Sequence, residues 1–392
     1  MNKSYCVMRR ILEIINLAGS AENFIGGQMS YFQNNGDYEV HLICSSGPHL
    51  DAFCKEQGVK YKAIPLNRQI SLVQDVKSFF SICNYIRKNK IDIIFCHQAK
   101  ARTLAIPASF LMGVKHRIIF SHGVLHETMK GLKRRLVLTN DRLLGKLATR
   151  VICVSHYVAN RRAKDGIDTP DKQVIIGHGS CSGIDVENVF NPNNINREKL
   201  TEISNRLGVD SDDYVMGFCG RLVKDKGIVE LTEAFELLRH RYPDKKLKLL
   251  IIGCPENRDA VPQYIMNRLM NNDNVVFTGS IPHIEMPYYY SLMNVFILPS
   301  HRDGLGMVPL EAQAMGVPAI VSSITGCKET IVDGVTGKYC DLSKESIADE
   351  IEYFFDLNKA NSMGQEGRNF VVKCFNSEVF KQQMLDFINT LT

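Results

Sequence analysis

Short apolar runs separated by longer amphipathic segments recur along the whole sequence, and this rhythm constrains the fold more than any other feature. In the first half the runs are residues 8–15, 38–44, 91–96, 116–120 and 150–154. They do not alternate apolar with polar residues, which is typical of strands buried on both faces of a parallel sheet. The segments between them, such as 72–88, have helical spacing. The first half is therefore predicted to be a doubly wound α/β domain.

The second half repeats the pattern with apolar runs at 214–219, 247–252, 274–277, 295–298 and 318–321. Between the halves lies a stretch rich in Gly, Asn and Ser, residues 177–194, which is typical of a linker. We expect two Rossmann-like domains, 1–188 and 189–375, and a final helix, 376–392, that packs back at their junction. Open sheets of this kind bind ligands at the carboxyl ends of their strands, so a cleft between the domains is the predicted site.

Composition excludes several other classes of protein. The chain has 392 residues, of which 45% are hydrophobic and 23% charged, so neither disorder nor a fibrous repeat is expected. No two of the 12 cysteines are separated by only two residues, which argues against a structural metal and a redox motif. Several, such as Cys153, lie inside apolar runs, where a reduced thiol behaves as a small hydrophobic group, so a reducing compartment is expected. Glu13 interrupts the first apolar run, which therefore reads as a buried strand rather than a signal peptide. A cytoplasmic protein with no spanning segment is expected.

Charge is distributed unevenly between the two halves. Residues 1–190 carry 26 Lys+Arg against 15 Asp+Glu, a net +11, whereas residues 191–392 carry 21 against 27, a net −6. Much of the excess lies in 126–150, where leucines are interleaved with basic residues that include Lys130, Lys133, Arg134 and Arg135. Such a helix suits a protein held peripherally on the inner face of an anionic membrane. The alternative is an ordinary helix with its leucines in the core.

The strongest motif follows the run 295–298. A loop with Asp303, Gly304 and Gly306 leads into a helix expected to start near Met307, which places Glu311 about one turn inside. Glycines at a helix start form a cradle suited to a diphosphate, and nearby carboxylates would accept hydrogen bonds from sugar hydroxyls. Alternatively, Asp303 is a turn former and Glu311 a solvated helix residue.

A second motif, Gly-Arg-Leu-Val-Lys-Asp-Lys-Gly, occupies residues 220–227 after the run 214–219. Arg221 and Lys226 would lie at the carboxyl edge of the sheet, where a guanidinium and an ammonium can reach a diphosphate. Lys224 in the same loop is expected to be a solvated surface residue.

Together, 220–227 and 303–311 resemble the retaining glycosyltransferases of family 4, which have the GT-B fold. Further matches, in the same order along the chain, are Gly26-Gly27-Gln28-Met29, His97, Ser121-His122-Gly123, Gly183-Ile184-Asp185 and Gly279. The region 97–185 looks most like bacterial enzymes that build capsular polysaccharide, O-antigen or other lipid-linked glycans.

The resemblance implies roles for individual residues. Arg221 and Lys226 would neutralise the donor diphosphate, Glu311 would hold the ribose hydroxyls, and His122 would lie near the donor sugar. Asp303 stands where the family usually has Glu, at the position that binds the hydroxyls of the donor sugar. The resemblance therefore leaves the identity of the donor sugar open. The other positions implied to bind substrate are Gly26, Gly27, His97, Gly220, Gly253, Gly279, Ile281, Gly304, Leu305, Gly306, Met307 and Val308.

The implied function is retaining transfer of a UDP-hexose or UDP-N-acetylhexosamine sugar to a lipid-diphosphate-linked glycan. The first domain would bind the acceptor and the second the nucleotide sugar, with neither cofactor, metal nor nucleic acid required. Asp210-Ser211-Asp212-Asp213 reads as a polar turn rather than a metal site. The alternatives are a sugar-nucleotide epimerase of the same fold and a two-domain protein that binds a ligand without reacting.

Overall fold

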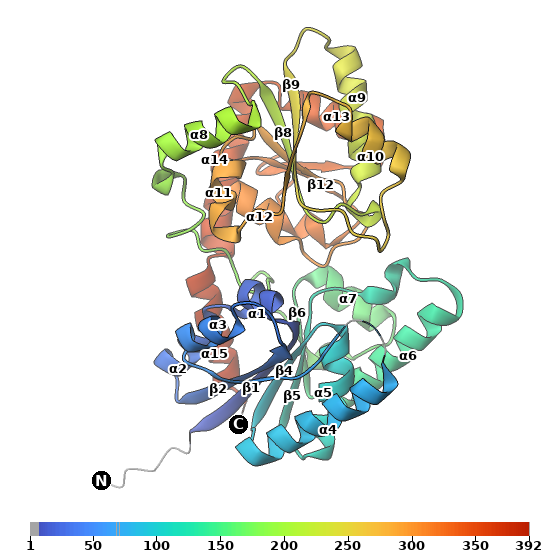
Figure 1. The fold of residues 1–392 in the computed structure, drawn as a ribbon, viewed down its shortest axis with the longest axis vertical. Coiled ribbons are helices and arrows are strands. Elements are labelled where there is room, and N and C mark those ends of the chain that lie inside the picture. Colours follow the sequence, from blue (N-terminus) through green and yellow to red (C-terminus); the bar gives the residue numbers. More distant parts are fainter. Residues whose placement is uncertain (1–7, 68, 70, 392) are drawn as a thin grey trace. The chain divides into compact units, whose positions relative to one another are not determined.

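The computed structural model of the chain describes residues 8–67, 69 and 71–391 and divides into two compact units (Figure 1). Unit 1 comprises Met1–Gly183 and Glu378–Thr392, and unit 2 comprises Ile184–Ser377. The chain thus crosses between the units twice, once within the glycine-rich segment 177–194. In unit 2 the two crossing segments pair with each other, because Ile184 N donates to Phe375 O and Ser377 N donates to Ile184 O.

Unit 1 contains a seven-stranded parallel sheet of order β3-β2-β1-β4-β5-β6-β7. The strands are β1 (Arg9–Leu17), β2 (Tyr38–Ser45), β3 (Lys60–Ala63), β4 (Ile93–His97), β5 (His116–Ser121), β6 (Arg150–Cys153) and β7 (Gln173–Val174). The five strands predicted from apolar runs are all present. The two edge strands, β3 and β7, have no such run and were not predicted. The strand order reverses between β1 and β4, which defines the switch point of this sheet.

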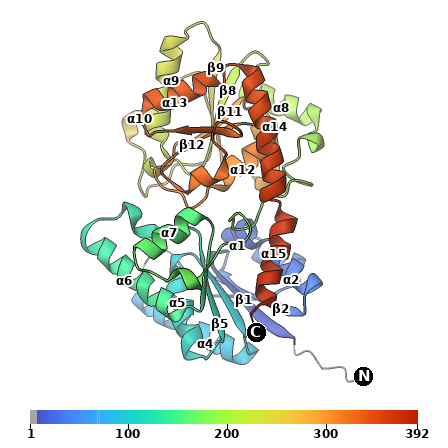
Figure 2. The same cartoon turned by 180° about the vertical axis from the view of Figure 1, so that it is seen from behind.

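The helices of unit 1 cover both faces of its sheet (Figures 1 and 2). They are α1 (Ala18–Ile25), α2 (Gln28–Asn35), α3 (Leu50–Glu56), α4 (Leu72–Asn89), α5 (Ala99–Leu111), α6 (Gly131–Leu147) and α7 (His156–Lys164), with the 3₁₀ turns η1 (Leu125–Thr128) and η2 (Pro170–Lys172). The final helix, α15 (Ser377–Asn389), packs on this unit: Tyr31 Oη donates to Gln382 Oε1 at 2.7 Å and Tyr38 Oη to Asn389 Oδ1 at 2.7 Å.

Unit 2 contains a six-stranded parallel sheet of order β10-β9-β8-β11-β12-β13. Its strands are β8 (Tyr214–Cys219), β9 (Leu247–Ile252), β10 (Val275–Gly279), β11 (Val295–Leu298), β12 (Ala319–Ser322) and β13 (Gly337–Cys340). The unpredicted strand is again at an edge, β13. The order reverses between β8 and β11.

The helices of unit 2 are α8 (Arg197–Leu207), α9 (Ile228–Arg241), α10 (Gln263–Met270), α11 (Met286–Tyr290), α12 (Met307–Ala314), α13 (Lys344–Tyr353) and α14 (Leu357–Cys374). The 3₁₀ turns are η3 (Pro192–Asn194), η4 (Lys224–Lys226), η5 (His283–Glu285) and η6 (Gly326–Thr330). The segment 344–374 forms two helices rather than one, because Asp356 caps a new start by accepting a hydrogen bond from Asn358 N.

The predicted fold class is confirmed in both units. Each is a doubly wound parallel sheet whose central strands are buried on both faces, for example Ile11 and Ile14 in β1 and Phe296 and Ile297 in β11, all with 0% exposure. This burial explains why unbroken apolar runs marked the strands.

Candidate active site

The loops after β8 and β11 meet at the switch point of unit 2. Gly227 has φ +74°, and a Cβ there would lie 2.0 Å from the carbonyl oxygen of Pro299, so the close approach of the loops requires glycine. Asp225 connects them further: its carbonyl accepts from His301 N at 2.8 Å, and its carboxylate accepts from Arg302 Nη2 at 2.6 Å. The basic loop and the carboxylate loop predicted from sequence therefore form one structure.

Lys226 and Asp303, one from each loop, form an ion pair. Their Nζ and Oδ2 atoms are 2.6 Å apart, and the two side chains are only 15% and 16% exposed. Asp303 is fixed from behind as well, since its carbonyl accepts from Gly326 N of η6 at 3.1 Å. A predicted cation and a predicted sugar-reading carboxylate thus lie in direct contact.

Glu311 lies inside α12 and is 7% exposed. Its Oε2 accepts from Tyr290 Oη at 2.8 Å, and its Oε1 lies 3.0 Å from His283 Nε2. The hydrogen bond to Glu311 raises the pKa of His283 above its usual value. Burial, together with the charge of Glu311, raises the pKa of the Cys219 thiol to about 12. Glu311 is therefore a buried hydrogen-bond acceptor, fixed by two partners at the carboxyl end of β8, and not a solvated helix residue.

The segment 304–308 forms the start of α12. Gly306 is its N-cap residue, with φ +88° and no side-chain cap. Leu305 is 3% exposed, so its side chain belongs to the core of unit 2, whereas Gly304, Met307 and Val308 are half-buried. Leu305 can therefore offer a ligand only its backbone.

The remaining predicted positions of unit 2 follow the neighbouring strands. Gly253 N donates to Gly279 O at 2.9 Å, and Gly220 N donates to Ile252 O at 2.9 Å, so Gly220, Gly253 and Gly279 form a row across the ends of β8, β9 and β10. Ile281 follows in the loop before η5 and is half-buried.

Arg221 does not lie beside Lys226, although both were expected to reach the same diphosphate. Its Nη1 lies 3.0 Å from Glu256 Oε2, and its side chain is 44% exposed.

In unit 1, His97 and His122 lie together at the switch point. His97 ends β4, His122 follows β5, and His97 Nδ1 lies 3.0 Å from His122 Nε2. The other nitrogen of His97, Nε2, lies 2.8 Å from Glu13 Oε2 of β1. Because His97 is 1% exposed and both its nitrogens are engaged, it can act on a ligand only through His122. Burial lowers the pKa of His97 to about 3 and that of His122 well below its usual value.

Gly26 and Gly27 form the turn between α1 and α2. Gly27 has φ +74°, and its N–H donates to Gln57 Oε1 at 2.9 Å. In α1 itself, Phe24 packs against the ring of His122 with 5.1 Å between ring centroids. The glycine turn and the histidines are thus connected through α1.

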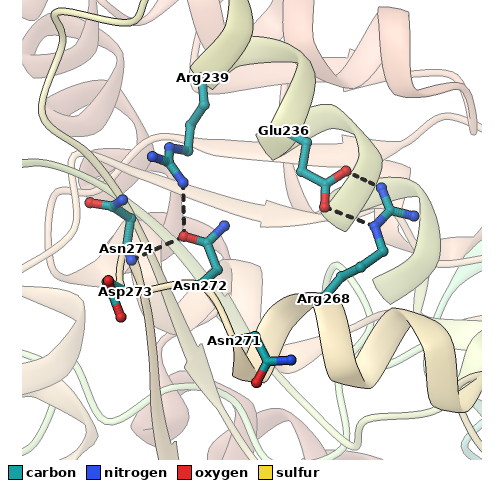
Figure 3. Close-up of a pocket in the computed structure, with 7 residues that line it drawn as sticks. All are labelled: Glu236, Arg239, Arg268, Asn271, Asn272, Asp273 and Asn274. Atoms are coloured by element: carbon teal, nitrogen blue, oxygen red, sulfur yellow. Dashed lines mark hydrogen bonds and ion pairs between the residues drawn. The ribbon is translucent and has the colours of Figure 1, made fainter.

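A separate hollow of about 330 Å³ lies away from these residues, where α9 and α10 end and β10 begins (Figure 3). Three of its charged side chains are engaged with their own neighbours, Arg268 with Glu236 and Arg239 with Asn272. It lies at the amino ends of the strands, the edge opposite to the loops described above.

The segment 210–213 precedes β8 at this same amino edge. Asp212 pairs with Lys246 at 2.5 Å and Asp213 with Lys248 at 3.0 Å, which fits the predicted polar turn. Within the described part of the chain, no group of three or more His, Cys, Asp or Glu side chains is placed to hold a metal ion.

Sequence reasoning missed several residues of these clusters. Asp225 was quoted within a motif but given no role, and Tyr290 and His283 come from a segment with no motif. Glu13 carried a signal, since a carboxylate inside an otherwise apolar strand requires a buried partner. That partner, His97, is 84 positions away in sequence.

The chain has two doubly wound units, and the switch point of one of them holds a cation, carboxylates and a glycine-rich helix start. This combination is typical of the GT-B glycosyltransferases. The family comparison agrees: the model described as Glycosyltransferase Family 4 matches residues 22–179, and that described as Glycosyl transferases group 1 matches residues 200–370. The chain belongs to glycosyltransferase family 4, since these two models together match most of it and a glycosyltransferase 30% identical to it is similar over nearly its full length.

That relative is the capsular polysaccharide biosynthesis glycosyltransferase CapM of Staphylococcus aureus, 30% identical over 97% of both chains. A second is the Escherichia coli UDP-Gal:alpha-D-GlcNAc-diphosphoundecaprenol alpha-1,3-galactosyltransferase, 28% identical over 87% of this chain and 86% of the other. Among solved structures, Anabaena Alr3699/HepE in complex with UDP-glucose has the same fold. Its TM-score is 0.79 at 17% identity, over 97% of this chain and 99% of that one.

Proposed function

We propose that this protein transfers a hexose or N-acetylhexosamine from a UDP-sugar to a lipid-diphosphate-linked glycan, with retention of anomeric configuration and without a metal ion. Unit 2 binds the donor and unit 1 the acceptor. The observation that carries the proposal is the cluster of Lys226, Asp303 and Glu311 around the β8/β11 switch point, where open sheets bind ligands. The relatives support the substrate classes, since one of them uses UDP-galactose and a diphosphoundecaprenol acceptor.

In the proposed reaction, the bond between the anomeric carbon and the diphosphate oxygen breaks through an oxocarbenium-like state. The acceptor hydroxyl attacks from the same face, and its proton passes to the departing UDP. Lys226 stabilises the negative charge that develops on the diphosphate, which is the protein's main contribution to the rate. Arg221 adds to this if it exchanges Glu256, its partner in the structure, for a phosphate oxygen. Glu311 accepts hydrogen bonds from the ribose hydroxyls, and Asp303 from the donor sugar.

Rate measurements on single variants test this assignment. Lys226→Ala and Glu311→Ala should each lose about 10²–10³ in rate, the loss typical of removing one group that stabilises transition-state charge. Lys224→Ala is the matched control, because Lys224 lies in the same turn with an exposed side chain. Wild-type turnover in both test variants contradicts the assignment.

Product analysis tests the reaction itself. The anomeric proton coupling in the product should show retention, and activity should persist in a chelator. Conversion of the nucleotide sugar without an acceptor identifies an epimerase instead. Binding of free sugars without UDP, and no turnover, identifies a ligand-binding protein.

We also propose that unit 1 associates with an anionic membrane, where a lipid-linked acceptor resides. The leucines of α6 are divided between two sides: Leu138 and Leu144 are buried, whereas Leu132 and Leu136 are 72% and 63% exposed. The predicted basic residues line the same helix; Lys130, Lys133 and Arg135 are exposed, and Arg134 is half-buried, 3.8 Å from Asp165.

Helix α4 is a second candidate for this association, and it packs against α5, as α6 does (Figures 1 and 2). Four of its apolar side chains are exposed: Leu72, Val73, Val76 and Phe80. Exposed apolar residues together with exposed lysines suit the headgroup region of an anionic bilayer. In the described residues, no helix is long and apolar enough to cross a membrane.

Sedimentation with phosphatidylglycerol-containing vesicles tests this surface. Changing Lys133, Arg134 and Arg135 to Glu should lower binding at least about 10²-fold, since each basic residue contributes roughly 1 kcal/mol near an anionic surface. The control changes three exposed lysines of unit 2 to Glu and alters the net charge equally: Lys344, Lys359 and Lys373. Equal sedimentation of the two triple variants contradicts the proposal.

A further inference from the structure

Three titratable side chains form a continuous hydrogen-bonded chain at the switch point of unit 1. Glu13 Oε2 lies 2.8 Å from His97 Nε2, and His97 Nδ1 lies 3.0 Å from His122 Nε2. Glu13 and His97 are 3% and 1% exposed, whereas His122 is half-buried. The chain therefore runs from a carboxyl group in the interior to the histidine that the sequence places near the substrate.

The proton positions along such a chain depend on one another, because a neutral imidazole has one donor nitrogen and one acceptor nitrogen. A protonated Glu13 donates to Nε2 of His97, which then donates from Nδ1 to Nε2 of His122. His122 must then carry its own proton on Nδ1. An ionised Glu13 accepts from Nε2 of His97, which reverses both hydrogen bonds and leaves Nδ1 of His122 as an acceptor.

We propose that Glu13 is a positioning residue, which acts through His97 to decide whether Nδ1 of His122 donates or accepts a hydrogen bond. This deepens the proposed function and rests on it for the ligand that His122 meets, a sugar hydroxyl or a phosphate oxygen of a substrate. At neutral pH the chain presents Nδ1–H, a donor that such an oxygen can accept. At alkaline pH it presents an unprotonated Nδ1, which cannot donate a hydrogen bond to a phosphate oxygen.

The surroundings of Glu13 favour a neutral carboxyl group. Burial raises the pKa of Glu13 to about 8 and lowers that of His97 to about 3, so both are uncharged at pH 7. The other titratable or charged groups on elements packed against β1 near this chain are Cys96 of β4, Cys44 of β2, Glu22 of α1, and Arg102 of α5 with its partner Asp141.

The two thiols and the guanidinium among these neighbours keep their protonation states across the relevant range. Burial raises the pKa values of the Cys96 and Cys44 thiols far above neutrality, and Arg102 remains a cation. His122 stays uncharged, because its burial and the nearby positive charge of Arg102 lower its pKa. Glu13 is thus the member of this cluster that titrates between about pH 7 and 9.

The proton position on His122 can be measured directly in the full-length protein without substrate. Long-range ¹H–¹⁵N correlation spectra of ¹⁵N-histidine-labelled protein distinguish the Nδ1–H from the Nε2–H form, and His122→Gln assigns the signals. In the wild type, we expect the Nδ1–H form at pH 7 and conversion to the Nε2–H form as the pH rises through about 8. In Glu13→Gln, which cannot ionise, this conversion should be absent up to pH 9.5.

Glu39→Gln is the matched control, since it removes a carboxylate from the neighbouring strand β2, where Glu39 pairs with Arg10 instead. It should retain the wild-type conversion. A constant form of His122 in the wild type, or an unchanged conversion in Glu13→Gln, overturns the proposal. Since the spectra need no turnover, they separate this outcome from a failure of the proposed glycosyl transfer. If transfer is confirmed, kcat/KM should lose its alkaline decline in Glu13→Gln.

Discussion

Removing Lys226 should affect donor binding through two separate terms. The first is the lost charge-assisted hydrogen bond to the diphosphate, about 1.5–3 kcal/mol. The second is the Asp303 carboxylate, which in the structure lies 2.6 Å from the ammonium and would be left unpaired. A carboxylate about 6 Å from a phosphate charge is repelled by roughly 3 kcal/mol at an effective dielectric constant of about 20. Residual exposure of both side chains screens about half of this repulsion.

The sum, roughly 3–4.5 kcal/mol, corresponds to a loss of about 10²–10³ in UDP affinity for Lys226→Ala. The second term predicts rescue: adding Asp303→Asn to Lys226→Ala should restore roughly tenfold, because the amide carries no charge. Calorimetric titration of UDP into the wild type, both single variants and the double variant measures all four affinities. Urea denaturation of the same four proteins confirms that each is folded.

Two results would refute this reasoning. If Lys226→Ala binds UDP as tightly as the wild type, the ammonium does not contact the diphosphate. If the double variant binds no better than Lys226→Ala, the carboxylate does not repel the ligand, and the whole loss belongs to the missing ammonium.

Three further predictions concern the surroundings of this cluster. Tyr290→Phe removes a buried donor to Glu311 and should lower the free energy of unfolding in urea by about 1–2 kcal/mol. Gly227→Ala should lower the melting temperature and kcat together, because the left-handed backbone costs about 1–2 kcal/mol and the methyl group meets the carbonyl of Pro299. His283 has a raised pKa when folded, so its stabilising effect is complete below the pKa of the unfolded chain, about 6.5, and is lost as the pH rises through the folded value. His283→Gln should therefore reduce the melting temperature at pH 5.5 more than at pH 8.5.

The sequence predicted the central strands because they are buried on both faces and must be continuously apolar, as in 295–298. Edge strands lack this constraint. Strand β3 is largely exposed and reads Lys-Tyr-Lys-Ala, and β7 has only two residues, Gln173 and Val174. Neither contains a pattern that distinguishes it from a loop, since such strands depend on a neighbour that only the folded sheet provides.

The same limit applies to the candidate site. Lys226 and Asp303 were found because each lies in a motif at the end of an apolar run. Their direct contact was not predicted, because it depends on the pairing of β8 with β11, which are separated by two other strands in the sequence. Arg221 was also found from its motif, but nothing in that motif indicated that it pairs with Glu256.

Three cations in the loops of the candidate site in unit 2 are each paired with a carboxylate. Lys226 pairs with Asp303, Arg221 with Glu256, and Arg302 with Asp225. A ligand must therefore exchange partners with the protein rather than neutralise free charges. Pyrophosphate alone would take the cations but leave carboxylates unpaired beside an anion, and a free sugar would meet the carboxylates but leave the cations where they are. A nucleotide sugar supplies phosphate oxygens and hydroxyls together, so the proposed donor would satisfy both sets of groups. We accordingly expect the affinity for a UDP-sugar to exceed that for pyrophosphate and for free sugar, and equal affinities in calorimetry would contradict this account.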